Sequence, residues 1–329
     1  MIDEAQAARV AEALKPVLER YAASPDGFTD PRYYPPSGAD PETVAAYFLV
    51  MVAMDHRLSR PGRPYEARLS GDGFYHGADL LYRLGARRLQ EDPGFFTPGR
   101  LARVTVEEVR AWLCVGDTCP PDPGVRAALL RDLGRKLQLL YRGSALRLIE
   151  EARGMLHTWD PGAPGLVERL RVFEAYSDPV EKKPMLLAKF LERRGVIEIH
   201  DPWNKRVPVD NHLTRIALRL GLLQPRPGLA EKIRRREPFT PWEDVELRIG
   251  VREAWHQVAR RAGYDDFILD DLLWTMGRRL CIHDAPRCRR CTGHPACVNN
   301  QCTLRPVCPT GLRAQKPLEE HLFLDTYWY

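Results

Sequence analysis

Four cysteines fall within seventeen residues near the end of the chain, in the stretch LLWTMGRRLCIHDAPRCRRCTGHPAC at positions 272–297. Their spacing is C-x6-C-x2-C-x5-C, and the arginines and proline between them leave no apolar face for a regular helix or strand. Four thiolates on so short a loop can enclose one metal centre, because both zinc and [4Fe-4S] clusters take four cysteine ligands. The stretch therefore predicts a metal site with four ligands: Cys281, Cys288, Cys291 and Cys297.

The residues leave alternatives to this site open. Zinc sites usually contain two separated C-x2-C pairs and this stretch contains one, but ligand type alone permits either metal. Disulfides are disfavoured because no secretory signal precedes the chain and the clustered loop suits a metal better. The C-x5-C spacing recurs, so Cys302 or Cys308 can replace one of the predicted ligands. Cys114 and Cys119 are too few for a closed site and are expected to be ordinary residues.

Composition indicates a soluble globular protein that we expect to be cytoplasmic and monomeric. The 329 residues are 44% hydrophobic and 28% charged, and no apolar run approaches the ~18 residues of a membrane span. The net charge of +5 is compatible with a polyanionic partner. Basic residues are concentrated at 278–316 and in LAEKIRRREPF at 229–239, which are candidate phosphate-contacting surfaces.

Helical periodicity recurs along the chain and strand-like alternation is nearly absent, so we predict an all-α fold with two helical lobes. The expected division is 1–160, 161–280 and a cluster loop with the tail at 281–329. Helices are expected at 4–22, with a kink at Pro16, and after Asp40-Pro41, where an apolar segment ends at Asp55 and His56. Further helices are expected at 105–114, 124–141, 144–153 and 164–173.

Two polar groups in the first lobe are candidate substrate contacts. Asp55 and His56 close the apolar helix, and Tyr75 and His76 lie in a Gly-rich turn that follows. Charged and aromatic residues at the end of a buried helix can line a ligand pocket. A capped helix end and a polar turn explain the same residues without any ligand.

The segment YSDPVEKKPMLLAKFLERRG has the signature of a helix start, with Asp178 as N-cap and Pro179 in the first turn. Lys182 and Lys183 then lie near the helix N-terminus, where the helix dipole and a like-charged neighbour lower the pKa of an amine. Such a lysine can act as a nucleophile. The alternative is a lysine whose long side chain carries its charge into water.

A second helix start occurs in WNKRVPVDNHLTRIALRLGLL, where Asp210 precedes an amphipathic helix that Gly221 ends. The helix after Lys182 advances only about 18 Å. The connection at 195–209 is long enough to return over that distance, so Asp210 is predicted to lie beside Lys182. His212, in the first turn of the second helix, is a further candidate for substrate contact.

These motifs resemble those of the helix-hairpin-helix N-glycosylase superfamily, to which endonuclease III and adenine glycosylase belong. EKKPMLLAK is similar to the helix that carries the catalytic lysine, VPVDNHLTRI to the aspartate segment, and 281–297 to the iron–sulfur loop. The resemblance implies a structural [4Fe-4S] cluster in preference to zinc, Asp210 as the catalytic carboxylate and Lys182 as a Schiff-base nucleophile. In place of the superfamily's Gly-rich hairpin this chain has FEAYSDPVEKK.

A second resemblance covers more of the chain. GDGFYHGADLLYRLGARRL, LLRDLGRKLQLLYRGSALRLIEEA and LDDLLWTMGR are similar to segments of the queuosine salvage proteins, which are nucleotide N-glycosidases with a related helical fold. Both resemblances imply cleavage of a base–sugar bond. The expected function is a DNA glycosylase, with or without strand-nicking lyase activity; the alternatives are a hydrolase of a modified nucleoside 5′-monophosphate and a non-catalytic binder of damaged nucleic acid.

Overall fold

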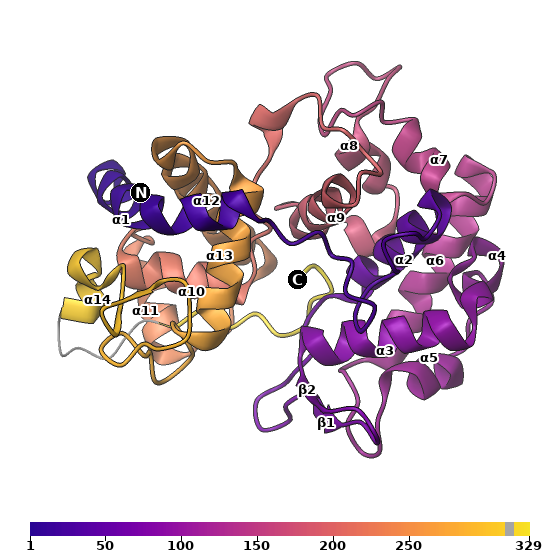
Figure 1. The fold of residues 1–329 in the computed structure, drawn as a ribbon, viewed down its shortest axis with the longest axis horizontal. Helices are drawn as coiled ribbons and strands as arrows, with labels where there is room; N and C mark the ends of the chain where they lie inside the picture. Colours follow the sequence, from indigo (N-terminus) through magenta and orange to yellow (C-terminus); the bar gives the residue numbers. More distant parts are fainter. Residues whose placement is uncertain (313–318) are drawn as a thin grey trace. The chain divides into compact units, whose positions relative to one another are not determined.

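A computed structural model describes residues 1–312 and 319–329 of the protein (Figure 1). The described chain is mostly helical, with two short antiparallel hairpins as its only paired strands, so the all-α expectation is confirmed. No described helix has the length and apolar character that crossing a membrane requires.

The chain forms two compact units. The first, called here the 26–204 unit, comprises Asp26–Asn204 with Thr326–Tyr329; the second, the 205–325 unit, comprises Met1–Pro25 with Lys205–Asp325. This division differs from the predicted boundaries at 160 and 280. A division by sequence order misses it because the N-terminal helix packs against helices more than 200 residues later.

The 26–204 unit contains eight helices, one hairpin and three short 3-10 turns among its described residues. Its hairpin pairs β1 with β2 in antiparallel register, Glu66 opposite His76. The elements in chain order are α2 (Pro41–Met54), β1 (Glu66–Arg68), β2 (Phe74–His76), α3 (Ala78–Glu91), η1 (Pro93–Phe96), α4 (Pro98–Leu101), α5 (Val106–Leu113), α6 (Pro123–Tyr141), α7 (Ala145–Glu150), α8 (Leu166–Leu170), η2 (Glu174–Tyr176), α9 (Lys182–Arg193) and η3 (Pro202–Asn204).

Helix α2 is the centre of this unit. The Asp40 side chain accepts the backbone N–H of Thr43, and Pro41 occupies the first turn, as the sequence predicts. Every residue from Val44 to Met54 is buried, because the helix is apolar on all sides and α3, α6, α7 and α9 pack around it. Its C-terminal end, where Asp55 and His56 lie, is thereby held inside the unit.

The start of α9 differs from the prediction. The Asp178 carboxylate does accept backbone N–H groups, those of Val180 and Lys182, but these bonds close a turn that precedes the helix. Glu181 has φ of 65°, which interrupts helical geometry, so α9 begins at Lys182. The first turn of the helix therefore carries both candidate lysines.

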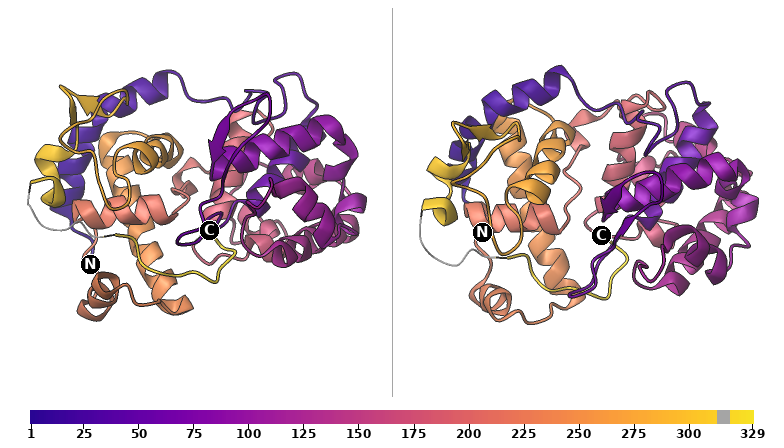
Figure 2. Two further views of the ribbon diagram at one scale, coloured as in Figure 1. Left: turned by 90° about the horizontal axis from the view of Figure 1, so that it is seen from below. Right: turned by 60° about the horizontal axis from the view of Figure 1, so that its bottom comes forward.

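In the 205–325 unit, α1 lies along α12 and α13, as the indigo and orange helices of Figures 1 and 2 show. Buried Gln6 on α1 donates to the carbonyls of Leu220 and Val307 at 2.6 Å, which joins α1 to the end of α10 and to the C-terminal segment. The elements in chain order are α1 (Glu4–Ala23, continuous through Pro16), α10 (Asn211–Leu220), α11 (Pro227–Arg235), α12 (Pro241–Ala262), α13 (Asp266–Arg279), β3 (Cys297–Val298), β4 (Gln301–Cys302), η4 (Arg305–Val307) and α14 (Pro309–Leu312).

Candidate functional site

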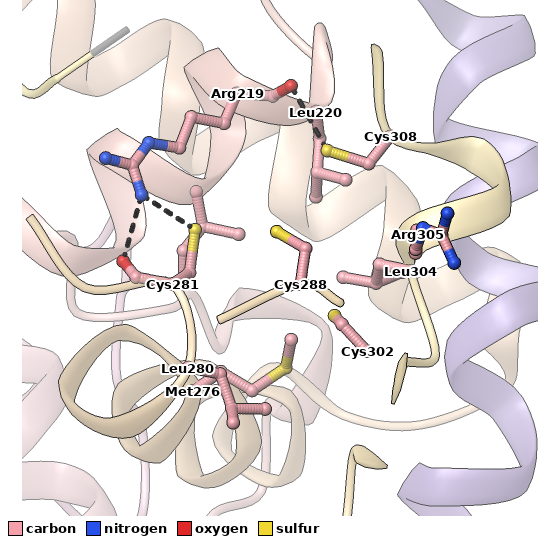
Figure 3. A pocket seen from close by; sticks show the side chains of 11 residues that line it. Arg219, Leu220, Met276, Leu280, Cys281, Cys288, Cys302, Leu304, Arg305 and Cys308 are labelled. Carbon is pink, nitrogen blue, oxygen red and sulfur yellow. Dashed lines mark hydrogen bonds between the residues drawn. The ribbon is translucent and has the colours of Figure 1, made fainter. Parts of the chain in front are cut away.

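Four cysteines surround one cavity in the 205–325 unit: Cys281, Cys288, Cys302 and Cys308 (Figure 3). All four are free thiols. No carboxylate or imidazole lines the cavity, and its remaining walls are apolar apart from two arginines. The other lining residues are Ile216, Arg219, Leu220, Met276, Leu280, Leu304 and Arg305.

The structure groups the cysteines differently from the prediction. Cys291 and Cys297 are joined by a disulfide, so two of the four predicted ligands have no thiol to offer, and Cys302 and Cys308 stand with Cys281 and Cys288 instead. Sequence spacing alone could not decide this, since C-x5-C occurs twice. A second disulfide joins Cys114 to Cys119, which corrects the expectation that these two are ordinary residues.

Burial and crowding act on the cavity thiols. Burial raises the pKa of Cys302 to about 12 and that of Cys308 to about 11, and neighbouring cysteines add to both shifts. The pKa of Cys288 is raised for the same two reasons. A bound cation would reverse this balance, because coordination requires the deprotonated thiolate.

Arginines from α10 reach the edge of the cavity. Arg219 donates to the Sγ of Cys281 at 3.3 Å and makes a two-pronged ion pair with buried Glu319, at 2.7 and 2.8 Å. Arg215 donates to the carbonyl of Cys281 and pairs with Glu320 at 2.8 Å. Helix α10 therefore binds the backbone of Cys281 after the end of α13. Its two arginines also neutralise the carboxylates of Glu319 and Glu320.

A second group of possible metal ligands lies nearby. His283, Glu319 and Glu320 each offer one ligand atom, and these atoms all lie within 4.8 Å of one another. Both carboxylates already receive an arginine, however, so the arginines compete with any cation for the same oxygens. The thiol cavity is the stronger candidate metal centre.

Asp210 lies at the other end of α10. It is half-buried, and its Oδ1 accepts the backbone N–H of Leu213 at 2.9 Å, which makes it the N-cap that the sequence predicts. Its Oδ2 accepts no hydrogen bond from any described residue, so one carboxylate oxygen remains for another partner. The neighbouring Asn211 has a buried side-chain oxygen without a hydrogen-bond partner in the described chain. Asn211 was not among the predicted site residues.

His212 is fixed within the unit. Its Nδ1 lies 2.7 Å from Arg215 Nη2, and burial lowers its pKa, so the neutral ring accepts from the arginine. Gly277 on α13 makes room for it, because a Cβ atom at that position would lie 2.5 Å from the Cβ of His212. His212 therefore has a packing role between α10 and α13.

In the 26–204 unit, Lys182 and Lys183 donate hydrogen bonds to carbonyls at the C-terminal end of α2. Lys183 Nζ donates to the Ala53 carbonyl at 2.7 Å, and Lys182 Nζ donates to the Asp55 carbonyl at 2.8 Å. Buried Arg126 donates to the carbonyls of Met54, His56 and Arg57, so a lysine or arginine reaches every carbonyl from 53 to 57. Cations at this position offset the negative end of the α2 dipole and satisfy carbonyls that lack helical partners.

The two lysines differ in environment. Lys183 is fully buried and its Nζ lies 3.2 Å from His56 Nδ1; burial, followed by the charges of Lys182 and Arg126, lowers its pKa well below the usual value. Burial likewise lowers the pKa of His56. Lys182 is 6% exposed and lies 3.5 Å from Asp55 Oδ2. The predicted candidates Asp55, His56, Lys182 and Lys183 are thus brought together.

The remaining predicted residues lie elsewhere. Tyr75 and His76 are on β2. The Tyr75 hydroxyl donates to Asp72 Oδ1 at 2.6 Å, and Asp72 also pairs with Arg83 on α3. Tyr75 therefore takes part in contacts between the hairpin and α3. Asp210 and Lys182 lie in different units, and their proposed proximity stays a prediction.

The basic segments also separate into two kinds. On α11, Lys232 pairs with Glu243, and Arg234 and Arg235 both pair with Glu231, so much of this charge is neutralised locally. On the cysteine loop, three exposed arginines make no ion pair with any described residue: Arg287, Arg289 and Arg290. Arg313 and Lys316, which contribute to the predicted basic stretch, lie outside the described residues.

Comparison with models of protein families matched no family, and comparison with curated proteins matched no relative.

Proposed function

We propose that this chain is an N-glycosidase that cleaves the bond between a base and its sugar, with a damaged base in DNA as the substrate. The observation that carries the proposal is the arrangement along α10. Asp210 presents a carboxylate oxygen that no described residue uses, and the same helix carries Arg219 to the four-thiol cavity. A rigid element thus joins the candidate catalytic carboxylate to the candidate metal centre.

The proposed role of Asp210 is electrostatic. Breaking a base–sugar bond develops positive charge on the sugar, and a carboxylate held beside it stabilises that charge at the transition state. The bond from the Leu213 N–H fixes Oδ1 and leaves Oδ2 for the sugar or for the attacking water.

Lysine attack is the second proposed route. Lys182 retains some exposure and leads α9, whereas Lys183 is fully enclosed. Attack by the Lys182 amine on C1′ of the sugar would expel the base, and opening of the sugar ring would then give an imine. Elimination of the 3′-phosphate from that imine would nick the strand. The amine must first leave the Asp55 carbonyl, so this route requires a rearrangement at the end of α2.

The choice of DNA rests on the cysteine loop. Arg287, Arg289 and Arg290 are exposed and lack local acidic partners in the described chain, which suits contact with phosphates. The proposed cofactor is a [4Fe-4S] cluster in the four-thiol cavity. The cavity lies between α10, α13 and the C-terminal segment, so the proposed role of the cluster is to support this loop. In this proposal the cluster takes no part in bond cleavage.

The test incubates the protein with duplexes that carry single damaged bases and, in parallel, with modified nucleoside 5′-monophosphates, and measures free base. We expect base release from a duplex and loss of release in Asp210→Asn. Borohydride traps any imine, and peptide mapping then identifies the modified lysine, with Lys182 expected. Release from the nucleotides alone would favour the salvage reaction. Absence of release from both classes, with DNA affinity unchanged in Asp210→Asn, would leave only a binding role.

A further inference from the structure

We infer that the four-thiolate centre is formed by Cys281, Cys288, Cys302 and Cys308, and that Cys291 and Cys297 are kept out of it as a disulfide. The inference rests on the cofactor in the proposed function and is independent of the proposed reaction. It assigns the ligands to a C-x6-C-x13-C-x5-C set in place of the C-x6-C-x2-C-x5-C set that the spacing first indicates.

The four thiols come from separate segments that the fold holds at one cavity. Cys281 follows α13, and its N–H donates to the Met276 carbonyl at 2.8 Å. Cys302 on β4 donates its N–H to the Cys288 carbonyl at 3.1 Å, which fixes those two residues together. Cys308 lies between η4 and α14, and its carbonyl accepts the N–H of Leu312 at 3.1 Å. Backbone hydrogen bonds therefore hold these four residues at one cavity.

Cys291 and Cys297 have a different arrangement. Cys291 is completely buried, its N–H donates to the Asn300 carbonyl, and its sulfur is bonded to that of Cys297. Neither residue lines the cavity. Metal ligands of this type are thiolates, and a disulfide sulfur is not one. The disulfide instead closes a small loop that leads into the β3–β4 hairpin, the element on which Cys302 lies.

The spacing of the sulfur atoms favours a cluster over a single ion. Tetrahedral zinc holds sulfurs at about 2.3 Å, which places the sulfurs themselves about 3.8 Å apart. Among the described residues, no three of the cavity thiols have sulfur atoms that all lie within 4.8 Å of one another. A cubane cluster binds each thiolate to a different iron and therefore needs wider spacing.

The surroundings suit a negatively charged cluster. Arg219 donates to Cys281 Sγ at 3.3 Å, and the backbone N–H of Gly311 lies 3.4 Å from Cys308 Sγ. Arg305 also borders the cavity. Hydrogen bonds to ligand sulfurs and nearby positive charge stabilise such clusters, and apolar walls from Met276, Leu280 and Leu304 limit access of solvent.

The first test maps the cysteines of the wild-type protein. The protein is unfolded anaerobically in the presence of iodoacetamide and a chelator, without a reductant. It is then digested, and the masses of its peptides are measured by mass spectrometry. We expect alkylation of the four cavity cysteines and a linked peptide that contains Cys291 and Cys297. Alkylation of Cys291 and Cys297, with Cys302 and Cys308 linked or unreactive, would overturn the assignment.

The second test compares two matched double variants by iron and sulfide content and by absorption at about 400 nm, a band of iron–thiolate charge transfer. Cys302→Ser with Cys308→Ser is expected to lose the band and the iron. Cys291→Ser with Cys297→Ser is expected to keep both. The reverse result, or loss in both variants, contradicts the ligand set. If a variant does not fold, the cysteine map of the wild type decides.

These results are separable from the proposed reaction. A protein with iron on the assigned ligands but no base release would retain the ligand set and remove the glycosidase proposal. Base release by a protein whose cluster uses Cys291 and Cys297 would support the glycosidase proposal and remove the ligand set. Zinc in place of iron in the wild type would overturn the cluster assignment.

Discussion

The guanidinium of Arg219 lies between a buried carboxylate and a cavity thiol: it donates twice to Glu319 and once to the Sγ of Cys281, at 3.3 Å. Its side chain is 1% exposed and that of Glu319 is 7% exposed. A buried ion pair of this kind costs desolvation when it forms, but removing one partner leaves the other charged and enclosed. We therefore expect the residue to couple the proposed metal centre to the stability of its unit.

Replacing Arg219 tests this coupling. Arg219→Ala is expected to lower the free energy of unfolding by about 3–5 kcal/mol, because Glu319 loses its partner, and to reduce iron content. Arg226→Ala is the matched control, since Arg226 also pairs with a glutamate but both side chains are exposed, and a loss of less than about 1 kcal/mol is expected. Denaturation in urea measures both. Equal losses in the two variants would count against the coupling.

Substitution can separate the N-cap role of Asp210 from its proposed catalytic role. Asparagine caps a helix about as well as aspartate, so Asp210→Asn should leave stability nearly unchanged while base release falls by roughly 100-fold or more. Asp210→Ala should in addition cost about 1 kcal/mol of stability. Asp40→Asn, at the equivalent N-cap of α2, controls for capping alone. Unchanged base release in Asp210→Asn would remove the residue from the reaction.

The contact between α10 and α13 depends on the absence of a side chain at Gly277. Gly277→Ala would place a Cβ atom 2.5 Å from the Cβ of His212, so we expect a loss of about 1–3 kcal/mol from overpacking. Gly228→Ala on α11 is the control, because nothing lies within 4 Å of the added atom. That change should be neutral or stabilising by up to about 1 kcal/mol. Thermal unfolding distinguishes the two outcomes.

Buried Lys183 predicts a dependence of stability on pH. Burial lowers its pKa in the folded protein below the 10.5 of the unfolded chain, so between those two values the unfolded state binds the extra proton. Stability should therefore rise with pH through this window and level off above about 10.5, with a slope of at most about 1.4 kcal/mol per pH unit.

Substitution isolates this contribution from that of other groups. Lys183→Met should flatten the rise, while Lys15→Met, at an exposed position on α1, should preserve it. Denaturant titrations at a series of pH values provide the measurement. An identical pH slope in the wild type and in Lys183→Met would mean that this lysine keeps its proton in the folded state.

Local signals predicted much of the secondary structure. The Asp40 and Asp210 caps, the apolar run of α2 and the terminating Gly221 all act through neighbours within a few residues, so the sequence shows them directly. The start of α9 was predicted too early, because the signature at Asp178 is also that of a turn. The positive φ of Glu181 distinguishes such a turn from a helix start, and the residue types alone do not reveal it.

The sequence by itself determined that the chain is helical, that its C-terminal cysteines are too concentrated for an ordinary loop, and that Asp210 caps the helix that follows it. The tertiary structure decided which thiols meet, that Lys183 is enclosed by Ala53 and His56, and that α1 belongs with α12 and α13. The reason is physical. Spacing along a chain fixes which groups are near in sequence, whereas a metal site or a buried amine depends on segments that packing brings together, and the repeated C-x5-C spacing left two such packings open.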